Sequence, residues 1–138
     1  VDVSPLAKVA SGGELSRIGL AIFTLTSRNT SVPTLIFDEV DSGVGGATGE
    51  VVGRMMKQLG HTRQVLCVTH LPQVAACGDH HLKVEKVSDG IETVSYLREL
   101  NPTQRVEEIA RMLGGLLITQ KTKVLAEEMV KANLSQEE

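Results

Sequence analysis

The chain has 138 residues, of which 41% are hydrophobic and 22% are charged, a composition typical of one globular domain with a real core. Aromatic residues make up only 2% and the net charge is −3. These values argue against a nucleic-acid-binding protein that stacks bases on aromatic side chains or presents an overall basic surface. No apolar run approaches the roughly 20 residues of a membrane span, and no signal peptide is evident. We therefore expect a cytoplasmic protein with no membrane contact, whose cysteines Cys67 and Cys77 stay free thiols. The first residue is valine rather than methionine, which predicts a piece of a longer protein.

The first predicted helix covers residues 11–28 and begins with Ser-Gly-Gly-Glu. Its apolar residues follow a period of 3.6. They are Leu15, Ile18, Ala21, Ile22 and Leu25. Two glycines at a helix start let a phosphate approach the free N–H groups and the positive helix end, and the Ser11 hydroxyl adds a donor. The alternative is a serine N-cap with flexible neighbours.

A short apolar run at residues 34–37 follows Pro33 and predicts a buried strand of a parallel sheet. Acids come directly after it, at the carboxyl end of the strand, where open α/β sheets bind ligands. Asp38 and Glu39 point to opposite sides of an extended backbone, so one can hold a metal while the other faces a different atom. This layout is typical of a strand with an aspartate for Mg²⁺ and a glutamate for the attacking water. The alternative is a solvated acidic turn after a core strand.

A second helix is predicted over residues 47–59, and residues 64–69 predict a second buried strand that leads to His70. Strand, helix and strand together have the length of one βαβ unit, so we expect the two strands to be parallel neighbours. His70 would then stand beside Asp38. The alternative is a histidine that caps a turn before Pro72.

The rest of the chain predicts a β-hairpin and two helices. Residues 81–87 and 91–100 flank Ser88-Asp89-Gly90, a sequence typical of a hairpin turn. A helix is predicted over residues 101–113, with a proline near its start and glycines at its end, and a last amphipathic helix over residues 119–133. We interpret the hairpin charges as a solvated face and the last helix as a packing or partner surface.

Three motifs occur in a fixed order: SGGE, an apolar strand followed by DEVD, and an apolar strand followed by TH. In this order they resemble the signature, the Walker B strand with its D-loop, and the switch histidine of ATP-binding-cassette ATPases. Glutamate as the fourth signature residue, and DEVD rather than Asp-Glu-Pro-Thr, favour the chromosome-maintenance (SMC-like) branch. The segments LAKVASGGELSR, TLIFDEVDSGVGG and VTHLPQVAACGDHH closely resemble a bacterial DNA-repair family of that branch, and the resemblance covers essentially the whole chain.

The resemblance implies an α/β fold, the C-terminal half of a P-loop NTPase head. The expected architecture is a mostly parallel sheet flanked by helices, followed by a β-hairpin and two helices, as a single domain over residues 1–138. It implies an ATPase that acts in DNA double-strand break repair and recombination, with ATP and Mg²⁺ as cofactors. The implied partners are a second head in a homodimer and DNA, bound through the full-length protein at the nucleoid.

Roles for the predicted site residues also come from the resemblance. Asp38 would orient Mg²⁺ through its water shell, Glu39 would polarise the attacking water, and His70 would contact the γ-phosphate. Asp41 would cross the dimer interface and help to align the opposite site. The signature residues would hold the γ-phosphate of the ATP bound by the partner head; they are Ser11, Gly12, Gly13 and Glu14.

One element of such a site is missing from the sequence. No G-x-x-x-x-G-K-[ST] occurs, and no lysine lies between Lys8 and Lys57, so the glycine-rich run Gly43–Gly49 is not a P-loop. The resemblance implies that the Walker A strand, the Q-loop and a coiled coil precede this chain in a longer protein. We therefore expect this chain to be inactive on its own.

Two alternatives belong to other classes of protein. Cys67-x-x-His70 and Cys77-x-x-His80 have a spacing found in zinc sites, although residues 67 and 70 face opposite sides of a strand. The other alternative is a non-enzymatic interaction module in which the same residues only pack. A metal assay tests the first, and ATP hydrolysis that depends on Glu39 tests the second.

Overall fold

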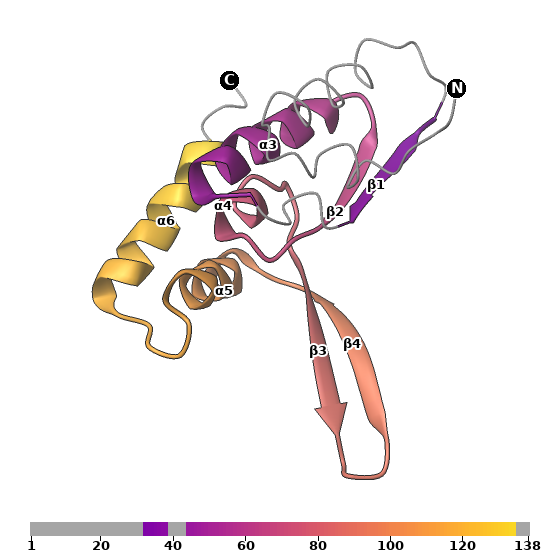
Figure 1. The fold of residues 1–138 in the computed structure, drawn as a ribbon, viewed down its shortest axis with the longest axis vertical. Coiled ribbons are helices and arrows are strands. Elements are labelled where there is room, and N and C mark those ends of the chain that lie inside the picture. The colour runs from indigo at the N-terminus through magenta and orange to yellow at the C-terminus, as the bar shows by residue number, and fades with distance from the viewer. Residues whose placement is uncertain (1–31, 39–43, 135–138) are drawn as a thin grey trace. The chain divides into compact units, whose positions relative to one another are not determined.

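The computed structural model describes residues 32–38 and 44–134 (Figure 1). The chain divides into two compact units between Cys77 and Gly78. The single domain expected over residues 1–138 stays a prediction, and the helix expected over residues 11–28 lies outside the described part. Within that part, no helix is both long enough and apolar enough to cross a membrane.

The first unit contains the expected strand–helix–strand arrangement. Its elements are β1 (Thr34–Asp38), α3 (Gly46–Leu59), β2 (Gln64–Val68) and α4 (Pro72–Ala75). The two strands are parallel, in a register that runs from Thr34 opposite Gln64 to Asp38 opposite Val68. The predicted parallel pairing is therefore confirmed. Helix α4 was not predicted, because four residues are too few to show a helical period.

The core of this unit lies between the sheet and α3. Side chains alternate along β1, so that Phe37 is buried while Ile36 on the opposite face is 71% exposed. Phe37 packs with residues of α3 and α4, and Val65 and Cys67 of β2 lie against the same cluster. The other buried members are Val52, Met56, Leu59 and Val74. This packing ties α3 to the sheet whose strand ends carry the predicted site.

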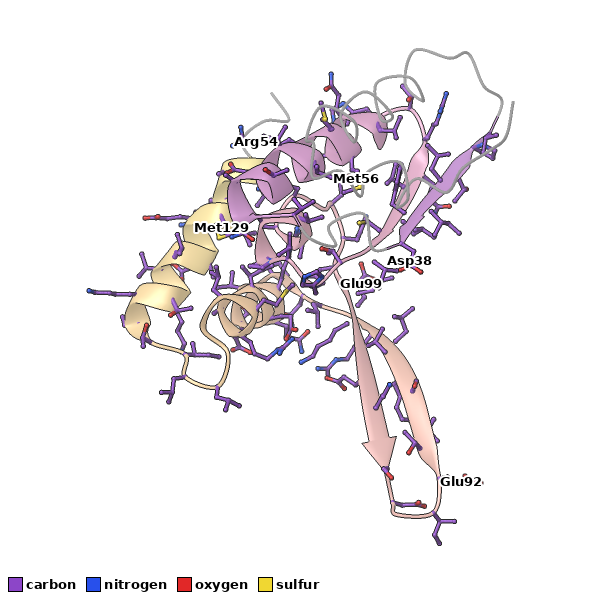
Figure 2. The ribbon with its side chains drawn as sticks, in the orientation of Figure 1. Asp38, Arg54, Met56, Glu92, Glu99 and Met129 are labelled. Carbon is purple, nitrogen blue, oxygen red and sulfur yellow. The ribbon has the colours of Figure 1, made fainter. Side chains whose placement is uncertain are left out.

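The second unit begins with the predicted hairpin, β3 (Leu82–Ser88) and β4 (Thr93–Glu99), which pair antiparallel. Asp89 closes the turn because its Oδ1 accepts hydrogen bonds from the N–H groups of Ile91 and Glu92, both at 2.8 Å. Gly90 adopts a positive φ of 89°, which a side chain would disfavour. Figure 2 shows Glu92 at the tip of this long ribbon.

Helices α5 (Pro102–Gly114) and α6 (Gln120–Leu134) complete the second unit. A capping box opens α5: the Asn101 side chain accepts a hydrogen bond from the Gln104 N–H, and the Gln104 side chain accepts one from the Asn101 N–H. Lys83, expected on a solvated face, instead bonds the buried Glu108 of α5 at 3.0 Å. Such a pair between distant residues leaves no local signal in the sequence.

Candidate functional site

Asp38 is the last residue of β1, at the carboxyl end of the parallel pair (Figure 2). Because Phe37 points into the core, the carboxylate of Asp38 lies on the opposite face of the strand, where it is exposed to solvent. Its partner in the register is Val68, the last residue of β2. An acid group is thus presented at the sheet edge where α/β folds bind ligands.

His70 follows β2 by two residues and is exposed. It lies in a short connection between the strand and α4, which begins at Pro72. The Thr69 hydroxyl oxygen accepts a hydrogen bond from the Leu71 N–H at 3.1 Å, across His70. Since the strands are parallel and end together, Asp38 and His70 lie at the same edge of the sheet.

The other predicted site residues lie outside the described part of the chain, so their roles stay predictions. They are Ser11, Gly12, Gly13, Glu14, Glu39 and Asp41.

The donor at this edge suits magnesium. Carboxylate oxygen is a hard ligand, and Mg²⁺ usually keeps several waters while one or two carboxylates and substrate phosphates complete its shell. Within residues 32–38 and 44–134, no three His, Cys, Asp or Glu side chains gather as a metal cage. The exposed carboxylate of Asp38 fits such a water-rich magnesium site, in which phosphate oxygens and water supply most ligands.

The surroundings of the two cysteines bear on the zinc alternative. Cys67 is partly buried against the hydrophobic core, as its place inside β2 requires. Cys77 is buried, and its thiol donates to the Gln73 carbonyl oxygen at 3.2 Å. In the part of the chain that the structure describes, neither cysteine joins a ligand cluster, and both serve as packing residues.

Close packing of α3 against α4 is the feature that the sequence interpretation missed. A Cβ atom at Gly53 would lie 2.7 Å from Cys77 Sγ and 3.2 Å from the Val74 Cα. A Cβ at Gly49 would lie 3.0 Å from Leu71 Cδ1. Spacings of three and four residues place Gly46, Gly49 and Gly53 on one helix face, a signal present in the sequence.

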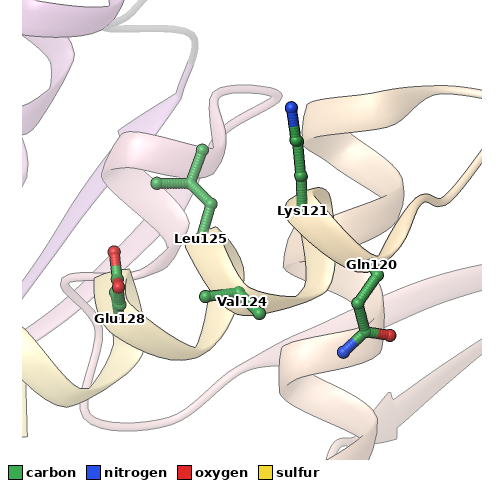
Figure 3. A pocket seen from close by; sticks show the side chains of 5 residues that line it. All are labelled: Gln120, Lys121, Val124, Leu125 and Glu128. Carbon is green, nitrogen blue, oxygen red and sulfur yellow. The ribbon is translucent and has the colours of Figure 1, made fainter.

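Two cavities in the described part of the second unit are lined by residues other than the predicted site residues. The first, of about 290 Å³, is formed by the α6 side chains drawn in Figure 3, and a single helix face makes it a shallow surface feature. The second, of about 280 Å³, lies beside His81 and Arg105. Burial, followed by the charge of Arg105, lowers the pKa of His81. Neither cavity contains the parallel strand ends.

Known proteins resemble this chain closely in sequence. It is 51% identical over 130 residues to the DNA repair protein RecN of Vibrio cholerae, and 53% identical over 126 residues to that of Haemophilus influenzae. These matches cover 94% and 91% of this chain, respectively. The chain belongs to the RecN family. It spans 24% of the length of the Vibrio RecN and 23% of that of the Haemophilus RecN. No protein-family model matches it.

The fold agrees with this RecN assignment. A solved structure from work on ATP-driven dimerisation and DNA-stimulated activation of SMC ATPases matches with a TM-score of 0.61. The match covers 85% of this chain and 70% of that chain, at 18% sequence identity. At that identity the likeness concerns the fold alone, and it confirms the predicted class, an α/β fold of the SMC ATPase head.

Proposed function

We propose that this chain is the C-terminal part of an SMC-like ATPase head in a longer DNA-repair protein of the RecN family. The head would hydrolyse ATP to ADP and phosphate and pair with a second head in an ATP-dependent way. The longer protein would bind DNA and act in double-strand break repair and recombination, in the cytoplasm at the nucleoid. The RecN relatives and the SMC head fold support this proposal.

The observation that carries the ATPase proposal is that β1 and β2 end together at one edge of the sheet. Parallel pairing of β1 and β2 puts Asp38 and His70 at one end of the sheet. Both side chains are exposed to solvent there. A packing role alone would not require a carboxylate and an imidazole at the same solvent-facing edge.

Each residue has a distinct task in the proposed site. Asp38 would hold water molecules of the Mg²⁺ shell, and the ion would neutralise charge on the ATP phosphates. Glu39, the next residue in the sequence, would point to the other side of the chain and orient the attacking water. His70 would donate a hydrogen bond to the γ-phosphate, and Asp41 would reach across to the second head.

The signature residues would serve the opposite head. Ser11, Gly12 and Gly13 would bring backbone N–H groups and a hydroxyl to the γ-phosphate of the partner's ATP. Glu14 would follow in the first turn of that helix. Each ATP site would then be built from two heads, with the lysine clamp supplied by a part of the longer protein that precedes this chain.

Two substitutions in the full-length protein separate the tasks of the adjacent acids. Glu39→Gln should keep Mg²⁺-ATP binding and lower the hydrolysis rate by roughly a hundredfold or more, since the amide cannot accept the water's proton. Asp38→Asn should instead raise the Mg²⁺ concentration needed for half-maximal activity. Hydrolysis that survives both changes would contradict the proposed ATPase site.

A further inference from the structure

We propose that Thr69 is a positioning residue for His70, and that Gly49 on α3 makes the space this arrangement needs. The inference rests on the proposed ATPase function, because it assigns a role to a residue that acts through the switch histidine. It goes beyond that function in naming what holds the histidine in place.

The first support is a hydrogen bond that spans His70. Thr69 Oγ1 accepts from the Leu71 N–H at 3.1 Å, a local side-chain-to-backbone turn of the kind that threonine hydroxyls form. The carbonyl oxygen of Leu71 in turn accepts from the Val74 and Ala75 N–H groups of α4, at 3.1 and 3.0 Å. The peptide groups on both sides of Leu71 are therefore held, and one of them is the group that joins His70 to Leu71.

The second support is the contact between Leu71 and α3. Leu71 Cδ1 lies 3.0 Å from the position that a Cβ at Gly49 would take, and Val74 Cγ2 lies 3.5 Å from it. With an alanine at position 49, Leu71 Cδ1 would have to move by a few tenths of an ångström. Leu71 also packs against the core cluster that contains Phe37, the neighbour of Asp38 in β1.

These contacts form a continuous path between the two site residues. Phe37 and the buried side chains of α3 fix the helix against β1, and Leu71 packs on the same cluster. Thr69 then ties Leu71 back across His70. His70 keeps an exposed side chain, and the peptide group that follows it is held by the Thr69 hydroxyl. This arrangement suits a donor that must keep a set place relative to Asp38.

The test is a double-mutant cycle on ATP hydrolysis by the full-length protein. Thr69→Val keeps the shape of the side chain but removes the acceptor, and Thr69→Ser keeps the hydroxyl. Both are made in the wild-type protein and in His70→Ala, and kcat, KM for ATP and the unfolding midpoint are measured. Misplacement of a catalytic group by about 1 Å can cost up to about a hundredfold, so Thr69→Val should lower kcat roughly tenfold with little change in KM.

In the His70→Ala background, Thr69→Val should have no further effect on kcat, since the residue it positions is gone. Thr69→Ser should stay close to wild type in both backgrounds. A Thr69→Val defect of equal size with and without His70, or no defect at all, would overturn the positioning role. An unchanged kcat in His70→Ala alone would overturn it together with the proposed role of His70, while a Thr69 failure alone leaves the ATPase proposal standing.

Gly49→Ala supplies a second variant on the other side of Leu71. The added Cβ would press on Leu71 Cδ1, so kcat should fall while the effect again disappears in His70→Ala. Gly45→Ala is the matched control, because a Cβ at that position meets nothing within 4 Å. Equal loss of kcat in Gly45→Ala and Gly49→Ala would contradict the role of the Leu71 contact.

Discussion

Asp38 and Val68 are the last register partners of two parallel strands, so both strands end together at one edge of the sheet. His70 follows Val68 by two residues, and the exposed carboxylate of Asp38 lies at the same edge. The register alone accounts for this meeting, because a shift of one residue would turn Asp38 toward the core face. The register that buries Phe37 in the core therefore also places the Asp38 carboxylate on the exposed face.

Gly53→Ala should destabilise the chain, although the same change in a helix normally stabilises it by up to about 1 kcal/mol. The new Cβ would lie 2.7 Å from Cys77 Sγ and 3.2 Å from the backbone of Val74, so α3 and α4 would have to move apart. Urea unfolding measures the loss. The double variant Gly53→Ala/Cys77→Ala should recover part of it, because Cys77 Sγ is the nearest of the three atoms that the new Cβ would meet. A stable single variant would show that the two helices are not packed so closely.

Acidification should weaken the fold through His81. Its pKa is lowered from 6.5, first by burial and then by the charges of Arg105 and Lys83, against an opposing effect of Glu108. The unfolded chain then binds a proton at a higher pH than the folded chain. Stability from this group is complete above pH 6.5 and falls as the pH drops from 6.5 through the folded pKa.

The measurement is the free energy of unfolding above and below pH 6.5, for the wild type and for His81→Gln. Glutamine carries no charge in this range, so the variant should lose less stability on acidification. Groups that do not interact with His81 titrate equally in both proteins, so the difference in stability reports His81 and its charged neighbours. Parallel pH curves for the two proteins would contradict the assignment.

The 138-residue chain by itself should bind Mg²⁺-ATP weakly or not at all and turn it over negligibly. A lysine and the loop amides of a P-loop supply much of the phosphate affinity in such sites, and this sequence contains no G-x-x-x-x-G-K-[ST]. Calorimetric titration compares this chain with the full-length protein. Micromolar binding by this chain alone would mean that it carries a different half of the site.

Local patterns sufficed to predict most elements in the described part of the chain. Strand β1 was recognised from its apolar run, and the hairpin from the turn residues around Asp89 and Gly90. Strand β2 was expected to continue through Thr69 but ends at Val68. The Thr69 side chain accepts a hydrogen bond from the Leu71 N–H, and the chain turns there toward α4. The apolar pattern of the sequence does not predict this turn.

Tertiary contacts explain what the sequence could not predict. The Lys83–Glu108 ion pair joins residues far apart in the chain, so no periodicity reports it. The spacing of Gly49 and Gly53 indicates a helix face that another segment approaches closely. That segment, the four-residue helix α4, is too short to show a helical period in the sequence. For the site, Asp38 and His70 could be placed at one sheet edge from the strand order alone, because parallel strands share that edge.

The most direct test of an ATP site shared between two heads is a mixing experiment with the full-length protein. Ser11→Arg should spare ATP binding but block pairing of the heads. The larger side chain would occupy the space proposed for the γ-phosphate of the ATP bound by the partner head. When the Ser11→Arg protein is mixed with a variant that lacks the P-loop lysine, one site of the mixed dimer carries both defects and the other is intact. ATP hydrolysis should then partly return. A mixture that stays as inactive as each variant, although mixed dimers are demonstrated, would contradict the shared site.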